Sequence, residues 1–237
     1  MSYYGQQPTG RGFFMGNSLS SAVRMLIAWN VILFLVQLLL PHRLEAVFGL
    51  VPSDVTRGQV WQLVTYMFLH STHGLPFHLL FNMLLLWMFG SELEGMWGTR
   101  KFVKYYFFTG IGAGITNVVV SLITRENAVT IGASGAIFGL LLAYGMTFPN
   151  RPVLLYFLIP IPAKYFVVLL GILELLFSRS QDGIAHFAHL GGILFGWIYL
   201  RSLGGGSPGG WKKRKPKQQF RVLEFRDRDA DEDERRR

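Results

Sequence analysis

Six long apolar segments that carry almost no charge constrain the fold of this sequence more than any other feature. A helix needs about 20 apolar residues to cross the ~30 Å hydrocarbon core of a bilayer. Only 16% of the 237 residues are charged and 51% are hydrophobic, whereas soluble domains carry about 25% charged residues. The pattern therefore predicts an all-α polytopic membrane protein. Its expected helices are residues 22–40, 77–97, 102–123, 133–148, 163–177 and 184–203.

The segments outside these apolar runs predict the domain organisation of the chain. Residues 1–20 and 204–237 are Gly-rich or densely charged, so we expect flexible ends around one membrane domain over residues 21–203. The first apolar run has no small-residue cleavage site after it, which favours a retained span over a signal peptide that is removed. Residues 41–76 combine charges with aromatic side chains, as expected of an ordered loop in the membrane interface.

Prolines predict the start of the fifth helix. Pro160 and Pro162 interrupt an apolar run, and proline removes a backbone donor and disfavours helix at the residue before it. We therefore expect residues 153–159 to form an interfacial or strand-like lead-in, and the fifth helix to begin near Ala163.

The distribution of charge predicts the orientation in the membrane. The formal net charge is +9, which nucleic-acid binding would also explain. The basic residues sit between the apolar segments and in the tail, which favours the cytoplasmic loops of a membrane protein. Six spans put both termini on this side, so we expect cytoplasmic termini in a bacterial inner membrane. The chain has no cysteine, which excludes disulfides and thiol catalysis, and we expect no metal ion or other cofactor.

Four polar residues fall at one depth in this arrangement, because the second, fourth and sixth spans all run from outside to inside. Each lies in the first or second turn of its span, a few residues below the outer surface. Two of them are four positions apart and share a helix face, although a hydrogen bond between helices would equally explain such a pair. The four residues are His78 and Asn82 in the second span, Ser134 in the fourth and His189 in the sixth.

The fourth span begins with Gly132-Ala133-Ser134-Gly135. Serine between glycines in a span is often only a close-packing device, and Gly135 and Gly139 do form a small-xxx-small pair. The start of a helix also offers free backbone N–H groups and the positive end of the helix dipole, which suit a developing oxyanion. Ser134 is therefore a candidate nucleophile as well as a packing residue.

The candidate base is His189. Gly192 and Gly196 lie on the same helix face, which can press against the glycine pair of the fourth span and bring His189 towards Ser134. A neutral imidazole there can take the hydroxyl proton and return it to a leaving amine. We expect no Asp or Glu in an obvious third position at this depth, so the sequence predicts a dyad and not a triad. His186, one turn earlier, is the competing base.

Three motifs carry a resemblance to a known family. HLLFNMLLLWMFG, GASGAIFGLLLAYG and AHFAHLGGILFGWIYL resemble, in this order and spacing, the motifs of rhomboid intramembrane serine proteases. The resemblance covers residues 26–200 and implies a six-helix core that cuts transmembrane segments near the outer membrane face. It also implies transmembrane protein substrates and the lipid bilayer as partners. The implied roles are Ser134 as nucleophile, His189 as base, and His78 and Asn82 with the Ser134 backbone N–H as oxyanion donors.

Other positions match or depart from the family pattern. Glu94 matches a structural acid at the end of the second helix. Trp61-Gln62 stands where the family often has Trp-Arg, so the role of that arginine is absent or moved. Both His70 and His73 fit the position of an additional structural histidine, and the sequence leaves the choice open.

The sequence therefore predicts an intramembrane serine endopeptidase, with the first loop and the fifth helix as candidate substrate gates. The alternative is a non-catalytic rhomboid-like protein that binds transmembrane helices, but such a protein would be expected to lack the serine or the histidine. A small-molecule transporter would predict internal repeats and mid-membrane charges. Glu174 is the one candidate mid-depth acid, and we interpret it as an acid near the outer end of the fifth span. The sequence specifies no oligomeric state.

Overall fold

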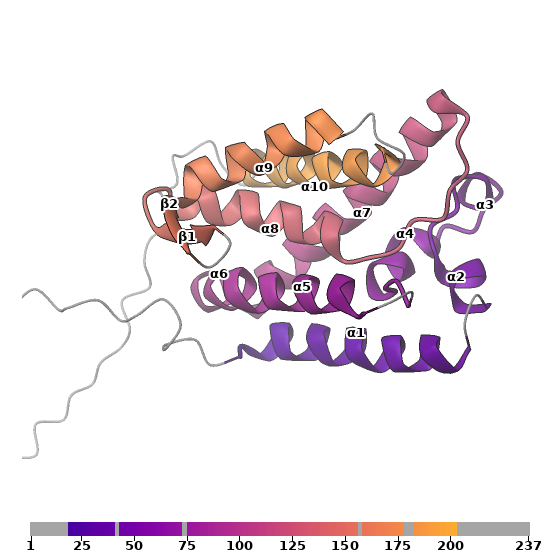
Figure 1. Cartoon of the computed structure of the whole chain (residues 1–237), viewed down its shortest axis with the longest axis horizontal. Helices are drawn as coiled ribbons and strands as arrows, with labels where there is room; N and C mark the ends of the chain where they lie inside the picture. Colours follow the sequence, from indigo (N-terminus) through magenta and orange to yellow (C-terminus); the bar gives the residue numbers. More distant parts are fainter. Residues whose placement is uncertain (1–18, 41–42, 73–74, 156–157, 178–182, 203–237) are drawn as a thin grey trace, which may run out of the picture.

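A computed structural model describes residues 19–40, 43–72, 75–155, 158–177 and 183–202. It is mostly helical; most of its long helices run in roughly the same direction, and the longest, Thr99–Thr124, crosses them obliquely (Figure 1). The expected flexible ends lie outside the described residues, except for residues 19–20.

The strands are β1 (Pro152–Leu155) and β2 (Ile159–Pro162). The helices are α1 (Ser21–Leu39), α2 (Arg43–Phe48), α3 (Pro52–Thr56), α4 (Gln62–Thr65), η1 (Tyr66–Phe68), α5 (Phe77–Leu85), η2 (Leu86–Gly90), α6 (Ser91–Trp97), α7 (Thr99–Thr124), α8 (Ser134–Thr147), α9 (Ala163–Phe177) and α10 (Gly183–Ser202).

Helices occupy all six apolar segments expected from the sequence. The second segment consists of α5, the π-helical turn η2 and α6 in succession. Within the described part of the chain, α1 and α7 are the two helices long and apolar enough to cross a membrane by length and composition, and α8 is a shorter apolar helix. The all-helical character of these segments is confirmed, while the bundle of six spans stays a prediction.

A two-stranded hairpin fixes where α9 begins. Its strands pair antiparallel, with Val153 opposite Ile161, and both prolines of the sequence prediction lie in β2. Directly after the hairpin, the N–H of Ala163 donates to the carbonyl of Arg151 (2.9 Å). The strand-like lead-in is confirmed, and α9 begins at Ala163 as the prolines predicted.

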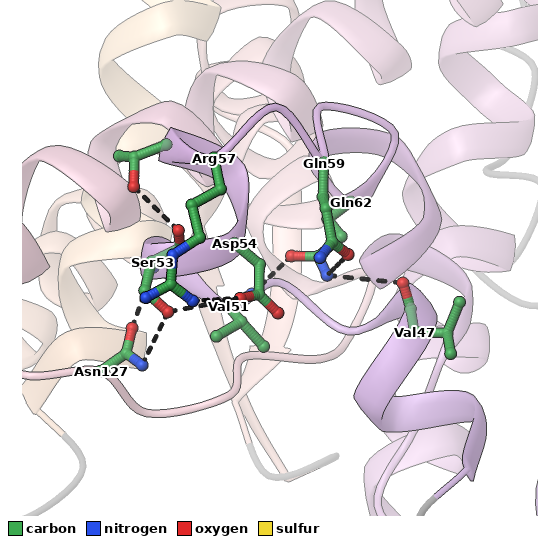
Figure 2. Close-up of polar contacts among 9 residues, drawn as sticks. Val47, Val51, Ser53, Asp54, Arg57, Gln59, Gln62 and Asn127 are labelled. Carbon is green, nitrogen blue, oxygen red and sulfur yellow. Dashed lines mark hydrogen bonds and ion pairs between the residues drawn. The ribbon is translucent and has the colours of Figure 1, made fainter.

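The loop between α1 and α5 is ordered by α2, α3, α4 and η1, and Figure 2 shows its polar contacts. Gln62 is fully buried. Its side-chain oxygen accepts the N–H of Val51 (2.9 Å) and its nitrogen donates to the carbonyl of Val47 (3.4 Å). Asn127, beyond the end of α7, accepts the N–H of Ser53 (2.9 Å). The predicted order of this loop is confirmed, and a neutral glutamine joins its turns at the position where the family often has arginine.

Helix α7 packs against both α8 and α10. An added Cβ at Gly112 would overlap the ring of Phe195 on α10, so only glycine allows this approach. On the side facing α8, the hydroxyl of Tyr105 donates to the carbonyl of Gly139 (2.7 Å). Helix α7 therefore holds α8 and α10 at a close and fixed distance.

Polar side chains lie inside the bundle and apolar side chains cover its outside. Asn30 and Gln37 of α1 are buried, and the Gln37 amide exchanges two hydrogen bonds with the backbone of His70 (3.1 and 2.9 Å). A surface of this kind suits hydrocarbon better than water. Its exposed side chains include Met25, Trp29 and Leu35 on α1, Val119 and Leu122 on α7, Val168 and Ile172 on α9, and Leu194 and Trp197 on α10.

The buried carboxylate of Glu94 on α6 caps the start of α1. It accepts the backbone N–H groups of Ala22 (3.0 Å) and Val23 (3.1 Å). It also accepts the hydroxyl of Thr99, the first residue of α7 (2.7 Å). A negative charge at a helix N-terminus satisfies its free N–H groups and its dipole. Glu94 therefore joins three helices, in agreement with the structural role implied by the resemblance.

We expect Glu94→Ala to lower the free energy of unfolding by about 2–3 kcal/mol, because it leaves the first-turn N–H groups of α1 buried without an acceptor. Thermal unfolding of the purified protein in detergent micelles measures the loss. Glu92→Ala is the matched control, since it removes a partly exposed ion pair with Arg151 that contributes about 0–1 kcal/mol. Equal losses in the two variants would contradict the capping role.

Candidate active site

Ser134 is the first residue of α8. The chain approaches it through Gly132, which has a φ of +129° that L side chains rarely adopt and donates its N–H to the carbonyl of Tyr66 (2.9 Å). The hydrogen bond from the N–H of Ile137 to Ala133 (3.1 Å) closes the first helical turn. The N–H groups before Ile137 have no partner within the helix, so this helix end favours a negative charge close to the serine.

The imidazole of His189 faces the hydroxyl of Ser134 across the contact between α8 and α10. Its Nε2 lies 2.7 Å from Ser134 Oγ, within reach of the proton that a general base would take. The ring of Phe138 stacks on the imidazole, with centroids 4.3 Å apart and planes 9° apart. Sequence reasoning missed Phe138, although its spacing of four from Ser134 puts both on one face of α8.

The glycines of α8 and α10 serve two different interfaces. An added Cβ at Gly192 would overlap the carbonyl oxygen of Gly135, and one at Gly196 would lie 3.4 Å from the Cα of Gly139. Gly192 and Gly196 of α10 thus face the backbone of α8. The sequence predicted that the Gly135 and Gly139 face would press against α10, but an added Cβ at Gly135 would lie 2.5 Å from Ala113 Cβ and one at Gly139 would lie 2.6 Å from Thr109 Cβ. The open sides of these two glycines therefore face α7.

The imidazole of His78 and the hydroxyl of Ser134 both lie next to the open side of Gly132. An added Cβ at Gly132 would lie 3.0 Å from His78 Nε2 and 3.7 Å from Ser134 Oγ. Because His78 Nδ1 accepts the N–H of Ser71 (3.3 Å), a neutral ring carries its proton on Nε2, which faces this space. The amide nitrogen of Asn82 donates to the carbonyl of His78 within its own helix (2.6 Å). Among the hydrogen bonds of the described residues, Asn82 therefore does not reach Ser134.

A carboxylate lies beside the imidazole, where the sequence predicted none. Glu174 Oε2 on α9 is 3.0 Å from His189 Nδ1, and the side chain is 12% exposed. The expectation that no acid occupies a third position is wrong. The depth of a residue along a span can be estimated from the sequence. Whether Glu174 faces the bundle depends on the rotation of α9 about its axis. A single acid in an apolar helix does not reveal that rotation.

The competing histidine lies on the other side of this carboxylate. His186 Nδ1 is 2.6 Å from the same Glu174 Oε2, whereas the Ser134 hydroxyl pairs with His189. The three ligand atoms of Glu174, His186 and His189 lie within 4.8 Å of one another, a spacing that could hold a divalent cation. The two hydrogen bonds to Glu174 account for this proximity without an ion.

His70 is the histidine of the first loop that can be located, since His73 lies outside the described residues. It is fully buried, and its ring centroid is 5.1 Å from that of His78. Burial, together with the neighbouring His78, lowers the pKa of His70 from its ordinary value of 6.5 to about 3. A neutral His70 ring therefore lies against the ring of His78.

The fold and the site together define a helical bundle in which a serine and a histidine meet between closely packed helices. A family sequence model described as the Rhomboid domain matches residues 57–205, more than half of the chain. The chain therefore belongs to the rhomboid family and is an integral membrane protein.

Curated relatives carry related names. The rhomboid protease GluP of Bacillus subtilis (strain 168) is 34% identical over 164 residues, which cover 68% of this chain and 30% of GluP. The mitochondrial rhomboid protein 1 of Saccharomyces cerevisiae is 31% identical over 145 residues, covering 56% of this chain and 40% of that protein. The putative rhomboid protease YdcA of B. subtilis is 32% identical over 147 residues, covering 61% and 67%. The match spans less than half the length of the first two relatives.

We expect Gly192→Ala to lower the free energy of unfolding by about 1–3 kcal/mol, because the new methyl group overlaps a backbone carbonyl that cannot move aside alone. Thermal unfolding in micelles measures this. The control is Gly171→Ala on α9, where an added Cβ would meet only Ile193 Cδ1 at 4.0 Å. The control should be neutral or slightly stabilising, since alanine favours helix. Unchanged stability of Gly192→Ala would refute the close approach.

Acid should destabilise the protein partly through His70. Its folded-state pKa of about 3 lies below the ordinary 6.5, so protonation favours the unfolded state. Its contribution is complete above pH 6.5 and is lost as the pH falls towards 3, with a limiting slope of about 1.4 kcal/mol per pH unit. We expect His70→Gln to remove this part of the slope. Unfolding free energies at pH 7.5, 6 and 5 test it, and identical pH dependence in both proteins would contradict it.

Proposed function

We propose that this protein is an intramembrane serine endopeptidase that cleaves transmembrane segments of other membrane proteins near the outer membrane face. One observation carries the proposal: Ser134 Oγ lies 2.7 Å from His189 Nε2 at the start of α8. A hydroxyl, a base within hydrogen-bond reach and free N–H groups at a helix end are the parts that acyl transfer needs. Membership of a family with members named proteases supports the same activity.

In the first half of the reaction, Ser134 Oγ attacks the carbonyl carbon of the substrate and its proton passes to His189 Nε2. The electron pair of the carbonyl double bond moves to oxygen and forms an oxyanion. When this intermediate collapses, the C–N bond breaks and His189 gives its proton to the leaving amine. An acyl-enzyme on Ser134 remains.

In the second half, His189 takes a proton from water, and the resulting hydroxyl attacks the acyl carbon. Collapse of the second oxyanion breaks the ester bond, and His189 returns its proton to Ser134 Oγ. The products are a new carboxylate and a new amine, and the enzyme is restored.

Three groups are proposed to stabilise the oxyanion. The Ser134 backbone N–H lies at the helix end, and His78 Nε2 borders the space in front of Ser134. Asn82 is the third proposed donor, and it must exchange its bond to the His78 carbonyl for one to the substrate. Such donors act when the charge develops, so they lower the barrier more than they tighten substrate binding.

The proposed setting is a membrane domain over residues 21–203 with six spans. The apolar side chains exposed on α1, α7, α9 and α10 support it. Basic residues concentrated on one side favour cytoplasmic termini in a bacterial inner membrane. The site would then open to the outer face, with the first loop and α9 as entry gates for transmembrane substrates.

We expect Ser134→Ala to reduce cleavage of a single-span substrate by at least about 10³-fold while thermal stability stays near that of the wild type. A fluorophosphonate probe should label the wild type at Ser134 and fail to label His189→Ala. Full cleavage by Ser134→Ala would sink the nucleophile assignment. Labelling that persists in His189→Ala and disappears in His186→Ala would transfer the role of base to His186.

A further inference from the structure

Glu174 is a largely buried carboxylate that the proposed reaction does not use. It belongs to α9, whereas Ser134 and His189 belong to α8 and α10. An acid in an apolar helix costs free energy unless its oxygens are hydrogen-bonded. Two imidazoles meet this requirement at one oxygen, since Oε2 lies 3.0 Å from His189 Nδ1 and 2.6 Å from His186 Nδ1.

The contact with Glu174 selects the tautomer of His189. A neutral imidazole has one N–H and one nitrogen lone pair, and an ionised carboxylate only accepts. The nitrogen beside Glu174, Nδ1, therefore carries the proton. Nε2 then presents its lone pair to the hydroxyl of Ser134 at 2.7 Å. Stacking by Phe138 fixes the plane of the ring, but it does not decide which nitrogen is protonated.

We propose that Glu174 is a positioning residue for His189 and completes a triad with Ser134, a proposal that rests on the proposed function. During attack, the Ser134 proton moves to Nε2, the Nδ1 proton stays on the ring, and Glu174 gains no proton. The imidazolium and the carboxylate then face each other as an ion pair until the Nε2 proton passes to the leaving amine. The carboxylate lowers the barrier because this charge pair exists only in the transition state and the intermediate.

The position of Glu174, the third residue of the proposed triad, depends on how α9 packs against its neighbours. Helix α9 packs against α8 and α10, and Val167 fills the space that glycine leaves at Gly145 of α8 (2.8 Å from an added Cβ). Glu174 lies in the last turn of α9, at the end remote from the hairpin. The triad is therefore complete only when this end of α9 lies against α10.

A purely structural role makes a different prediction. If Glu174 only tied α9 to α10, its bond to His186 would serve as well as its bond to His189. Loss of either partner would then cost stability and substrate binding alike. Variants of Glu174 and His186 therefore separate the two explanations.

The experiment uses the full chain in proteoliposomes with a fluorogenic single-span substrate. We expect Glu174→Gln to lower kcat by about 10²-fold or more and to change KM less than about threefold. His186→Asn should lower kcat less than about fivefold. The matched control is Glu126→Gln, the same chemical change at an exposed carboxylate, which should behave as the wild type. The rate of fluorophosphonate labelling at Ser134 should follow kcat across these variants, since the probe needs no transmembrane segment.

A spectroscopic measurement tests the tautomer without activity. In histidine-labelled protein in micelles, the ¹⁵N shifts of His189 should report a proton on Nδ1 in the wild type. Glu174→Leu, which removes the acceptor, should move His189 towards the Nε2–H form, while His78 keeps its shifts. Identical His189 shifts in both proteins would overturn the positioning role.

Three further outcomes decide the proposal. A kcat of Glu174→Gln within threefold of the wild type, with Ser134→Ala inactive, overturns the triad and leaves the proposed function standing. If Glu174→Gln and His186→Asn raise KM and lower the unfolding temperature by equal amounts, Glu174 only holds α9 against α10, and the positioning role is overturned. Cleavage that survives in Ser134→Ala removes the proposed function, and the triad with it.

Discussion

The approach of Gly192 to the carbonyl of Gly135 is the contact on which the rest of the site depends. No side chain fits between these backbones, so α10 lies directly on the first turn of α8. That distance puts the imidazole of His189 beside the hydroxyl of Ser134. Gly135 and Gly139 also leave room on α8 for the side chains of Ala113 and Thr109 on α7. Without a hydrophobic force between helices inside a bilayer, such close van der Waals contact is the main attraction that remains.

A small number of buried polar groups position the parts that close packing alone cannot fix. Glu94 joins the starts of α1 and α7, and Gln62 joins the turns of the first loop. Gln37 holds the backbone of His70, whose ring lies against His78. The side chains of Glu94, Gln62 and Gln37 have their hydrogen-bond partners inside the protein, as a low-dielectric setting requires.

The sequence predicted the helices and the principal pair for reasons that depend on position along the chain. Apolar length located the long helices, prolines located the start of α9, and the expected helix directions put Ser134 and His189 at one depth. It could not predict features that depend on rotation or rotamer. The turn of α9 about its axis brings Glu174 to His189, and the rotamer of Asn82 directs its amide to its own helix. Phe138 was within reach of sequence reasoning, because a spacing of four is a position rule.

The hairpin before α9 fixes one end of this helix, and Glu174 lies near the other end. At the fixed end, the backbone N–H groups of Ala163 and Lys164 donate to carbonyls of the preceding loop (2.9 and 3.1 Å). Eleven residues separate Ala163 from Glu174, about 16 Å at 1.5 Å per residue. A tilt of about 10° over that length displaces the carboxylate by about 3 Å, which equals the distance between Glu174 Oε2 and His189 Nδ1 (3.0 Å). A small change in the angle of α9 would therefore be enough to separate the carboxylate of Glu174 from the imidazole of His189.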